Sequence, residues 1–389
     1  MRNASPTLHR TGARNYSERP LLIYWELTQA CALTCRHCRA EASPHRHPFE
    51  LNTSEGKQLL RQIAGFGDPL PHLILTGGDP LERPDIFELI DEACALGITV
   101  SITPSATERL TREMIIRLHN HGIQSMGLSL DGATPKRHDK VRGIPGCFER
   151  TMRALRDAED LGLPVQINTL VAEETADELP AIYNLLTQHR VMRWALFFLI
   201  GVGRGQVLRE VTPELGEELM RWIYLRSLNA PFAIKTTEAP SYRRVALETA
   251  RRMGIPGHDI RRSSISQSFG IRDGNGIVFV SHTGAFYPSG FLPLPSGHVR
   301  TDNLVDVYRS ASLFCNLRDS QQLKGKCGRC EYRVICGGSR ARAFAATGDP
   351  LESDPLCPYQ PGESRRPPLN QIFEASNSWP GRSSQLADE

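Results

Sequence analysis

The sequence lacks a long apolar run. Its strongest one, from Trp194 to Ile200, spans seven residues, whereas a membrane-spanning helix needs about 18 or more. The first 20 residues carry four arginines but no apolar segment followed by a cleavage site, as a secretory signal would have. We therefore expect a protein that neither spans a membrane nor is secreted, and that works in the cytoplasm.

The sequence also has no large excess of charge of one sign. The 389 residues hold 46 Lys and Arg against 43 Asp and Glu, a formal net charge of +3, and only six of the basic residues are lysine. This small, dispersed charge gives no reason to expect nucleic acid as a partner. The contents of 40% hydrophobic and 23% charged residues exclude disordered and fibrous proteins. The length predicts one large domain and a smaller one.

From Leu21 to about Gly205, short apolar runs rich in β-branched residues alternate with amphipathic stretches of helical period. Strict alternation of strands and helices indicates an α/β fold with a parallel sheet. Six such units suit an open, partial barrel as well as a doubly wound sheet, and in both folds ligands bind at the carboxyl ends of the strands. The expected strands are 21–28, 72–76, 99–103, 125–130, 165–171 and 194–199.

This rhythm ends after Gly205. A helix is expected from Pro213 to Leu228, and a hairpin from Ile277 to Pro288, around the turn His282-Thr283-Gly284, indicates a small appended domain. The tail is rich in Ser, Pro and Asn and poor in apolar residues, which predicts disorder. We divide the chain into a disordered segment 1–20, a core 21–205, a linker region with helices 206–268, a C-terminal domain 269–361 and a disordered tail 362–389.

Ten cysteines are unevenly grouped, which favours metal or redox chemistry over disulfides in a cytoplasmic protein. Cys31, Cys35 and Cys38 form C-x3-C-x2-C directly after the first expected strand. Three thiolates can ligate three irons of a [4Fe–4S] cluster and leave the fourth iron open to another ligand. The alternatives are a zinc site that borrows His37 or His45, or unrelated buried thiols.

With this motif in this place, the chain resembles the radical S-adenosylmethionine (SAM) superfamily. Thr76-Gly77-Gly78-Asp79-Pro80 is similar to the superfamily's Gly-Gly-Glu-Pro segment, with Asp79 in place of Glu. The resemblance implies a partial (β/α)6 TIM-type barrel and an enzyme that reductively cleaves SAM to methionine and a 5′-deoxyadenosyl radical. That radical takes hydrogen from a substrate. A one-electron donor such as ferredoxin or flavodoxin is implied as a partner.

The resemblance also implies which residues contact SAM. The backbone of Gly77, Gly78 and Asp79 would receive the methionine amino group, and Arg142 would face its carboxylate. The other implied contacts lie at strand ends: Ser129 and Asp131 beside Arg142, Asn168 at the ribose, and Leu199 at the adenine.

A second set of cysteines, Cys327, Cys330, Cys336 and Cys357, reads C-x2-C-x5-C-x20-C. Four sulfurs fit structural zinc or an iron–sulfur cluster. This segment resembles the SPASM domain of many radical SAM enzymes, which implies an auxiliary [4Fe–4S] cluster. Ser289 and Arg340 stand where that pattern has ligands of a further cluster, so we expect one auxiliary cluster and not two. The remaining cysteines, Cys94, Cys147 and Cys315, are expected to be buried free thiols.

The substrate is indicated by the run from Lys326 to Pro358, which resembles the branch of radical SAM enzymes that remodels tetrapyrroles in haem and d-type haem biosynthesis. Arg340 and Arg342 would face substrate carboxylates, or would be solvated on a helix. The alternative is a maturase that modifies a ribosomal peptide; the roughly 20 residues before the first strand are too few for the peptide-recognition module of many such enzymes. A non-catalytic zinc scaffold is disfavoured by the odd number of cysteines in the first motif.

Overall fold

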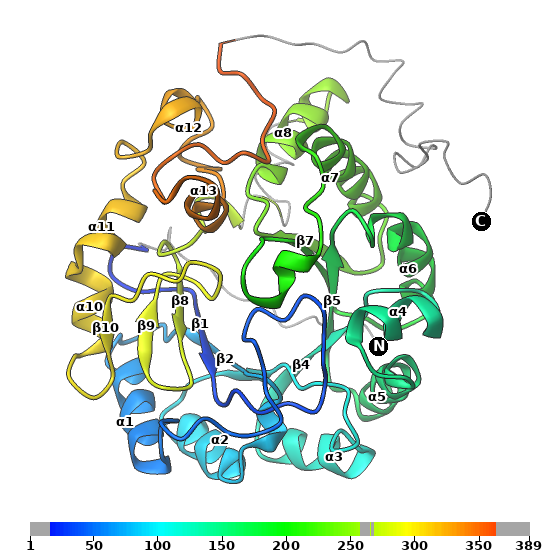
Figure 1. Cartoon of the computed structure of the whole chain (residues 1–389), viewed down its shortest axis with the longest axis vertical. Coiled ribbons are helices and arrows are strands. Elements are labelled where there is room, and N and C mark those ends of the chain that lie inside the picture. Colours follow the sequence, from blue (N-terminus) through cyan, green and yellow to red (C-terminus); the bar gives the residue numbers. More distant parts are fainter. Residues whose placement is uncertain (1–15, 257–264, 266–267, 363–389) are drawn as a thin grey trace.

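The computed structural model describes residues 16–256, 265 and 268–362. Across these residues one sheet runs in the order β10-β9-β8-β1-β2-β3-β4-β5-β6-β7 (Figure 1). Neighbours from β1 to β7 pair in parallel and in chain order, which confirms the α/β class and the partial-barrel type. The strands are β1 (Leu22–Glu26), β2 (His72–Thr76), β3 (Val100–Ile102), β4 (Ile123–Ser129), β5 (Val165–Val171), β6 (Arg193–Phe198), β7 (Ala233–Thr237), β8 (Ile277–Val280), β9 (Ala285–Tyr287) and β10 (Gly297–His298).

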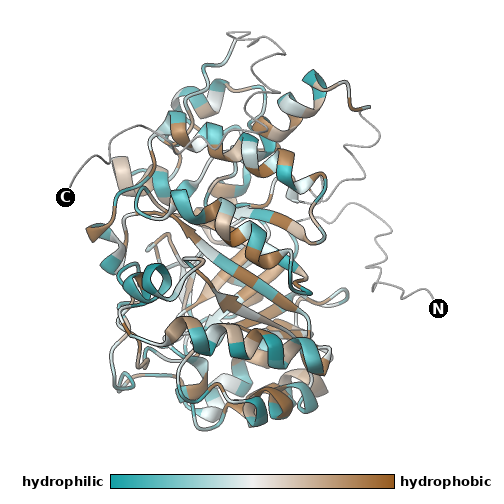
Figure 2. Ribbon diagram, turned by 90° about the vertical axis from the view of Figure 1, so that its right-hand side faces the viewer, coloured by the Kyte–Doolittle hydropathy of each residue, from teal (hydrophilic) through white to brown (hydrophobic). Residues whose placement is uncertain are grey.

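Helices follow the parallel strands and cover the outer face of the sheet (Figure 1). Figure 2 shows apolar residues concentrated in the strands and helices that carry both apolar and polar residues. The helices are α1 (Thr53–Ala64), α2 (Ile86–Ala95), α3 (Arg112–Asn120), α4 (Pro135–Arg142), α5 (Cys147–Leu161), α6 (Leu179–Leu186), α7 (Pro213–Ser227), α8 (Tyr242–Arg252), α10 (Leu304–Ser310), α11 (Ser312–Arg318), α12 (Gly325–Arg329) and α13 (Arg340–Thr347), with 3₁₀ turns η1 (Pro80–Glu82), η2 (Ala176–Glu178) and η3 (Gly203–Val207).

Local sequence explains where these helices begin and which side they bury. Asn52 and Glu55 form a reciprocal capping box at the start of α1, and the Thr111 side chain caps α3. In α5 the buried residues follow helical spacing, from Thr151 through Leu155 to Ala158. Among the described residues, no helix combines the length and apolar character needed to cross a bilayer.

The expected six strands are present, two with the predicted limits and four with ends shifted by one or two residues, but the sequence analysis missed β7. This strand lies in the segment 206–268 that was predicted to be a linker with helices, and it pairs in parallel with β6. It escaped notice because it is short and carries Lys235 inside the barrel, where an apolar residue was expected. The barrel therefore contains a seventh parallel strand.

The expected hairpin forms, with β8 and β9 antiparallel, yet it is not a separate sheet. β8 pairs in parallel with β1, so Leu22 lies beside Ile277. The sheet thus runs through the predicted limits at 205 and 268, and the division into domains at those positions stays a prediction. The predicted disorder of 1–20 and 362–389 falls almost entirely outside the described residues.

Candidate functional site

The loop that follows β1 carries the first three cysteines, and hydrogen-bond donors point at their sulfurs. The backbone N–H of Leu33 lies 3.3 Å from Cys31 Sγ, and that of Ala42 lies 3.4 Å from Cys38 Sγ. Arg142 Nη1 lies 3.7 Å from Cys35 Sγ. Burial raises the pKa of the Cys31 thiol to about 11. Donors and a cation around buried sulfurs suit thiolates held by a metal cluster better than free thiols.

The loop after β2 approaches this cysteine loop closely. Gly78 N donates to Thr28 O at 2.8 Å and Asp79 N to Ala30 O at 2.7 Å. A Cβ atom at Gly78 would lie 2.4 Å from Ala30 O, so a larger residue there would push the two loops apart. Position 78 therefore requires glycine because of this contact within the protein, whether or not a ligand also approaches it.

A cavity of about 320 Å³ opens at the carboxyl ends of the strands. Its size is typical of sites for small ligands. It joins the cysteine loop to residues from β4, β5 and β6. Of the predicted site residues it is lined by Cys31, Cys35, Cys38, Gly77, Gly78, Ser129, Asp131, Arg142, Asn168 and Leu199.

Asp79 is the predicted site residue whose side chain does not line this cavity. It is fully buried, and its carboxylate accepts from Leu81 N at 3.2 Å, Ser105 N at 3.3 Å and Thr107 Oγ1 at 2.8 Å. Burial raises its pKa to about 6. The Asp79 side chain thus holds the neighbouring loops together, while its backbone N–H donates to Ala30 O and its carbonyl oxygen accepts from Glu82 N at 3.0 Å.

Arg142 lies at the cavity wall and is already paired. Its Nη2 lies 2.5 Å from Asp131 Oδ2, and its Nε is buried without a hydrogen-bond partner in the described part of the chain. Burial alone would raise the pKa of Asp131, but the Arg142 guanidinium, together with His37, His138 and the Leu170 N–H, outweighs it and holds this pKa below its usual value. One edge of the guanidinium is therefore committed to Asp131, and Nε remains available for another acceptor.

The second set of cysteines also lines one small cavity, with donors aimed at the sulfurs. Gly338 N lies 3.4 Å from Cys336 Sγ, and Asp354 N lies 3.4 Å from Cys327 Sγ. Two buried arginines add positive charge: Arg244 Nη2 is 3.8 Å from Cys357 Sγ, and Arg340 Nη2 is 3.8 Å from Cys327 Sγ. The environment of these sulfurs is thus similar to that of the sulfurs in the first set.

Two expectations about arginines are wrong. Arg340 and Arg342 neither face a substrate nor lie in solvent, because both are buried inside the protein. Arg340 donates to Pro350 O at 3.0 Å and to Glu352 O at 2.7 Å. Both residues lie on the face of α13 that packs against the rest of the protein. Their guanidinium groups therefore point toward backbone carbonyls.

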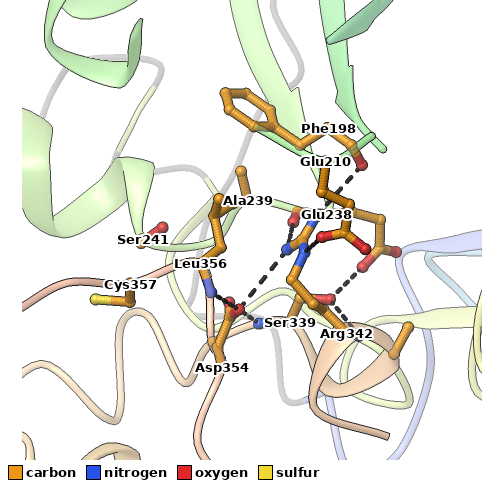
Figure 3. A network of polar contacts seen from close by, with 12 residues as sticks. Phe198, Glu210, Glu238, Ala239, Ser241, Ser339, Arg342, Asp354, Leu356 and Cys357 are labelled. Carbon is orange, nitrogen blue, oxygen red and sulfur yellow. Dashed lines mark hydrogen bonds and ion pairs between the residues drawn. The ribbon is translucent and has the colours of Figure 1, made fainter. Parts of the chain in front are cut away.

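Arg342 is the centre of a polar network that joins distant parts of the chain (Figure 3). It donates to Glu210 Oε2 at 2.7 Å, to Glu238 O at 2.6 Å and to Leu199 O at 2.9 Å. Its Nη1 lies 3.7 Å from Asp354 Oδ1, next to the second set of cysteines. One side chain thus fixes the ends of β6 and β7 to the segment that precedes Cys357.

The isolated cysteines were expected to be buried. Cys147 is buried, but Cys94 and Cys315 are exposed on α2 and α11. Cys315 Sγ donates to Arg309 O at 3.4 Å. The apolar faces of these two helices are formed by other residues, so nothing requires their thiols to be covered.

The sequence analysis also missed cavity residues. Glu238, directly after β7, lines the cavity, as do Arg204 of η3 and Ser105. Arg204 braces the cysteine loop by donating to Cys35 O at 3.1 Å and to Ala42 O at 2.8 Å. The alternation of Phe232 and Ile234 before a Thr-Thr-Glu ending is the signal that would have revealed β7 and, with it, Glu238.

Known proteins share this architecture. A family model of the radical SAM superfamily matches residues 25–186. The AdoMet-dependent heme synthase of Methanosarcina barkeri (strain Fusaro / DSM 804) is 38% identical over 344 residues, which are 88% of this chain and 98% of that relative. The chain belongs to the radical SAM superfamily. It is therefore an enzyme that uses a [4Fe–4S] cluster and SAM and needs an electron donor and a substrate.

More distant proteins are also similar. The PqqA peptide cyclase of Bradyrhizobium diazoefficiens is 25% identical over 353 residues, which are 88% of this chain and 87% of that relative. The crystal structure of Streptococcus suis SuiB bound to S-adenosylmethionine has a TM-score of 0.68 at 17% identity, covering 87% of this chain and 77% of that one. The latter likeness shows the fold alone.

The Arg142→Lys substitution tests the predicted SAM contact. Lysine keeps the charge but loses the planar fork that could serve Asp131 and a ligand carboxylate together. We expect SAM affinity to fall about 10- to 100-fold, the equivalent of roughly 1.5–3 kcal/mol for one charge-assisted contact. Anaerobic calorimetry measures the affinity, and equal affinity of the variant and the parent would reject this role for Arg142.

The Arg342→Met substitution tests the polar network. It leaves buried carbonyls and carboxylates without their donor, and we expect a loss of about 2–4 kcal/mol in unfolding free energy. The control is Arg209→Met, since the Arg209 side chain is 72% exposed in its ion pair with Glu173 and should matter by less than about 1 kcal/mol. Thermal unfolding under anaerobic conditions compares the two variants. Equal decreases in their unfolding temperatures would contradict the importance of the network.

Proposed function

We propose that this radical SAM enzyme modifies acidic side chains of a tetrapyrrole, in haem or a haem-like product. The observation that carries this proposal is the similarity to the AdoMet-dependent heme synthase, which extends over 98% of that relative at 38% identity. The peptide cyclase, at 25% identity, supports a peptide substrate less strongly. The fold alone does not discriminate between them, because one fold serves many substrates.

In this proposal Cys31, Cys35 and Cys38 hold the SAM-binding cluster. When bound, the reduced cluster supplies the electron that cleaves SAM to methionine and a 5′-deoxyadenosyl radical. The backbone of Gly77, Gly78 and Asp79, with Arg142 beside Ser129 and Asp131, binds the methionine part. Asn168 and Leu199 orient the nucleoside. The cavity walls exclude water from the radical and fix its distance to the substrate.

We further propose that Cys327, Cys330, Cys336 and Cys357 hold an auxiliary [4Fe–4S] cluster. Tetrahedral zinc would draw its sulfurs to about 3.8 Å of one another, given Zn–S bonds of about 2.3 Å. In the described ranges, no three His, Cys, Asp or Glu side chains gather as one metal ion requires. Four thiols around a shared cavity, with four donors aimed at three of them, support thiolates that hold a group larger than one metal ion.

The remaining parts of the proposal concern partners and organisation. Ferredoxin or flavodoxin is the proposed electron donor, because the reaction takes single electrons at low potential. Residues 21–205 are proposed as the SAM-binding core and 269–361 as the SPASM-like domain, joined by 206–268. The paths of β7 and β8 support a tight connection between these parts, since both strands extend the core sheet.

The experiment that tests this function incubates the anaerobically reconstituted protein with SAM, dithionite and iron coproporphyrin III. We expect formation of 5′-deoxyadenosine together with a tetrapyrrole of lower mass, detected by chromatography and mass spectrometry. Sirohaem is a second tetrapyrrole to be tested. Failure of the protein to bind or alter either compound would reject the proposal and favour the peptide-maturase alternative.

A further inference from the structure

Glu238 has an unusual backbone conformation at the edge of the cavity. It follows β7 directly, at the carboxyl end of the strand, and lines the cavity with the predicted SAM contacts. Its φ of 59° lies in the left-handed region, where a Cβ atom is unfavourable. Within the described residues, Glu41 with a φ of 48° is the other non-glycine residue of this kind. Such strain persists when the surrounding structure imposes it, and it is concentrated at functional sites.

The C-terminal part of the chain fixes Glu238 through two contacts (Figure 3). Arg342 Nη1 donates to its carbonyl oxygen at 2.6 Å, and Ser339 Oγ donates to Oε2 at 2.6 Å. Ser339 Oγ in turn accepts from Arg342 N at 3.1 Å. The backbone and one carboxyl oxygen are therefore held in place, while Oε1 has no hydrogen-bond partner in the part of the chain that the structure describes.

The surroundings of Glu238 favour a neutral carboxylic acid. No cation forms an ion pair with its carboxyl group among the described residues, because the Arg342 guanidinium is occupied by Glu210 and by carbonyl oxygens. Burial raises the pKa of Glu238 well above its usual value, and the nearby Asp273 carboxylate adds to the shift. The charged or titratable groups that interact with it are Asp273, Asp354, Arg342 and Tyr24.

A neutral acid with one free oxygen is suited to an acidic ligand. We propose that Glu238 contacts the substrate and donates a hydrogen bond from Oε1 to one of its carboxylate groups. This inference rests on the proposed function, which supplies a substrate with carboxylate side chains. A hydrogen bond from a neutral acid to a carboxylate is short and strong, whereas an ionised Glu238 would repel the same group. Glu238 thus selects acidic substrates and, through Ser339 and Arg342, is positioned by the C-terminal segment.

Two substitutions separate the hydrogen bond from the fold. Glu238→Gly removes the side chain and relieves the left-handed strain, so the variant should unfold at the same temperature as the parent or higher, yet bind iron coproporphyrin III at least about tenfold more weakly. Glu238→Gln keeps an acceptor for Ser339 and a donor for the substrate, and should bind within about threefold of the parent. Glu88→Gln is the control, because the Glu88 side chain is 55% exposed on α2 in its ion pair with Lys57 and should leave porphyrin binding unchanged.

The pH dependence gives a second test. As pH rises through the elevated pKa of Glu238, the parent gains a negative charge and should lose affinity for the porphyrin. The affinity of Glu238→Gln for the porphyrin should not change over the same pH range. Difference infrared spectra of the parent and Glu238→Gln at neutral pH should show the carbonyl band of one protonated carboxyl group. Its absence, or equal affinity of Glu238→Gly and the parent, would overturn the role of Glu238.

The failures of the two proposals are distinguishable. If the parent binds neither iron coproporphyrin III nor sirohaem, the proposed function falls, and the acidic substrate assigned to Glu238 falls with it. If the parent binds iron coproporphyrin III and its methyl ester equally well, carboxylates are not recognised, and the inference about Glu238 is overturned while a tetrapyrrole substrate stands. We expect the parent to bind the methyl ester more weakly than the free acid. The ester should bind to the parent and to Glu238→Gly with equal affinity.

Discussion

The variant in which Cys31, Cys35 and Cys38 are all replaced by alanine should form no 5′-deoxyadenosine from SAM under dithionite. Without these thiolates no iron is held where SAM must bind, so the expected loss is complete and not a change in rate constant. The measurement is chromatographic detection of 5′-deoxyadenosine after anaerobic reconstitution of the variant and the parent.

A cysteine from the same cavity supplies the control for this experiment. Cys147 is buried, lines the cavity and belongs to neither predicted ligand set. Cys147→Ala should retain iron and form 5′-deoxyadenosine, although removal of one buried sulfur costs about 1 kcal/mol or more of stability. Cleavage of SAM by the triple variant at the parent's rate would show that the first cysteine set does not hold the catalytic cluster.

The Cys327→Ala/Cys330→Ala variant should lose about four of about eight irons per chain, as expected when one of two [4Fe–4S] clusters is lost. Metal binding in a small domain contributes directly to its folding free energy, so thermal unfolding should begin at a markedly lower temperature. Arg340 would also lose the Cys327 sulfur that lies 3.8 Å from its Nη2.

Iron, sulfide and zinc analysis of natively purified protein decides between the two metals. Iron and sulfide near eight per chain support two clusters, whereas one zinc with about four irons would assign the second set to zinc. The first set of cysteines should be unaffected in the Cys327→Ala/Cys330→Ala variant, which should still form some 5′-deoxyadenosine.

The cysteine sets and the parallel core could be predicted because their signals are local. C-x3-C-x2-C after a strand, and apolar runs such as Val165–Val171, are visible in the sequence, and this strand has the predicted limits. Asn168 and Ser129 could be placed at the cavity because the family resemblance implies contacts there and because ligands of this fold bind at the carboxyl ends of the parallel strands.

The missed features depend on contacts between distant residues. Arg342 was expected to face a substrate carboxylate or to be solvated on its helix, and only the folded chain brings Glu210, Glu238 and Leu199 to its guanidinium. The carboxyl group of Glu238 is likewise held by Ser339, which is 101 positions away. No local pattern encodes such contacts, since they follow from how α13 packs against the strand ends.

The pairing of β1 with β8 has a consequence for synthesis of the protein. Leu22 lies next to Ile277 in the sheet, so one edge of the strand that leads into the first cysteines stays uncovered until residue 277 leaves the ribosome. At about 5–20 residues per second, the intervening stretch takes roughly ten seconds to a minute to make. During that interval the nascent chain exposes an unpaired apolar edge, and contacts of such long separation slow folding. The order of assembly is therefore set by the last strands to be synthesised, and chaperones have the greatest opportunity to act before they appear.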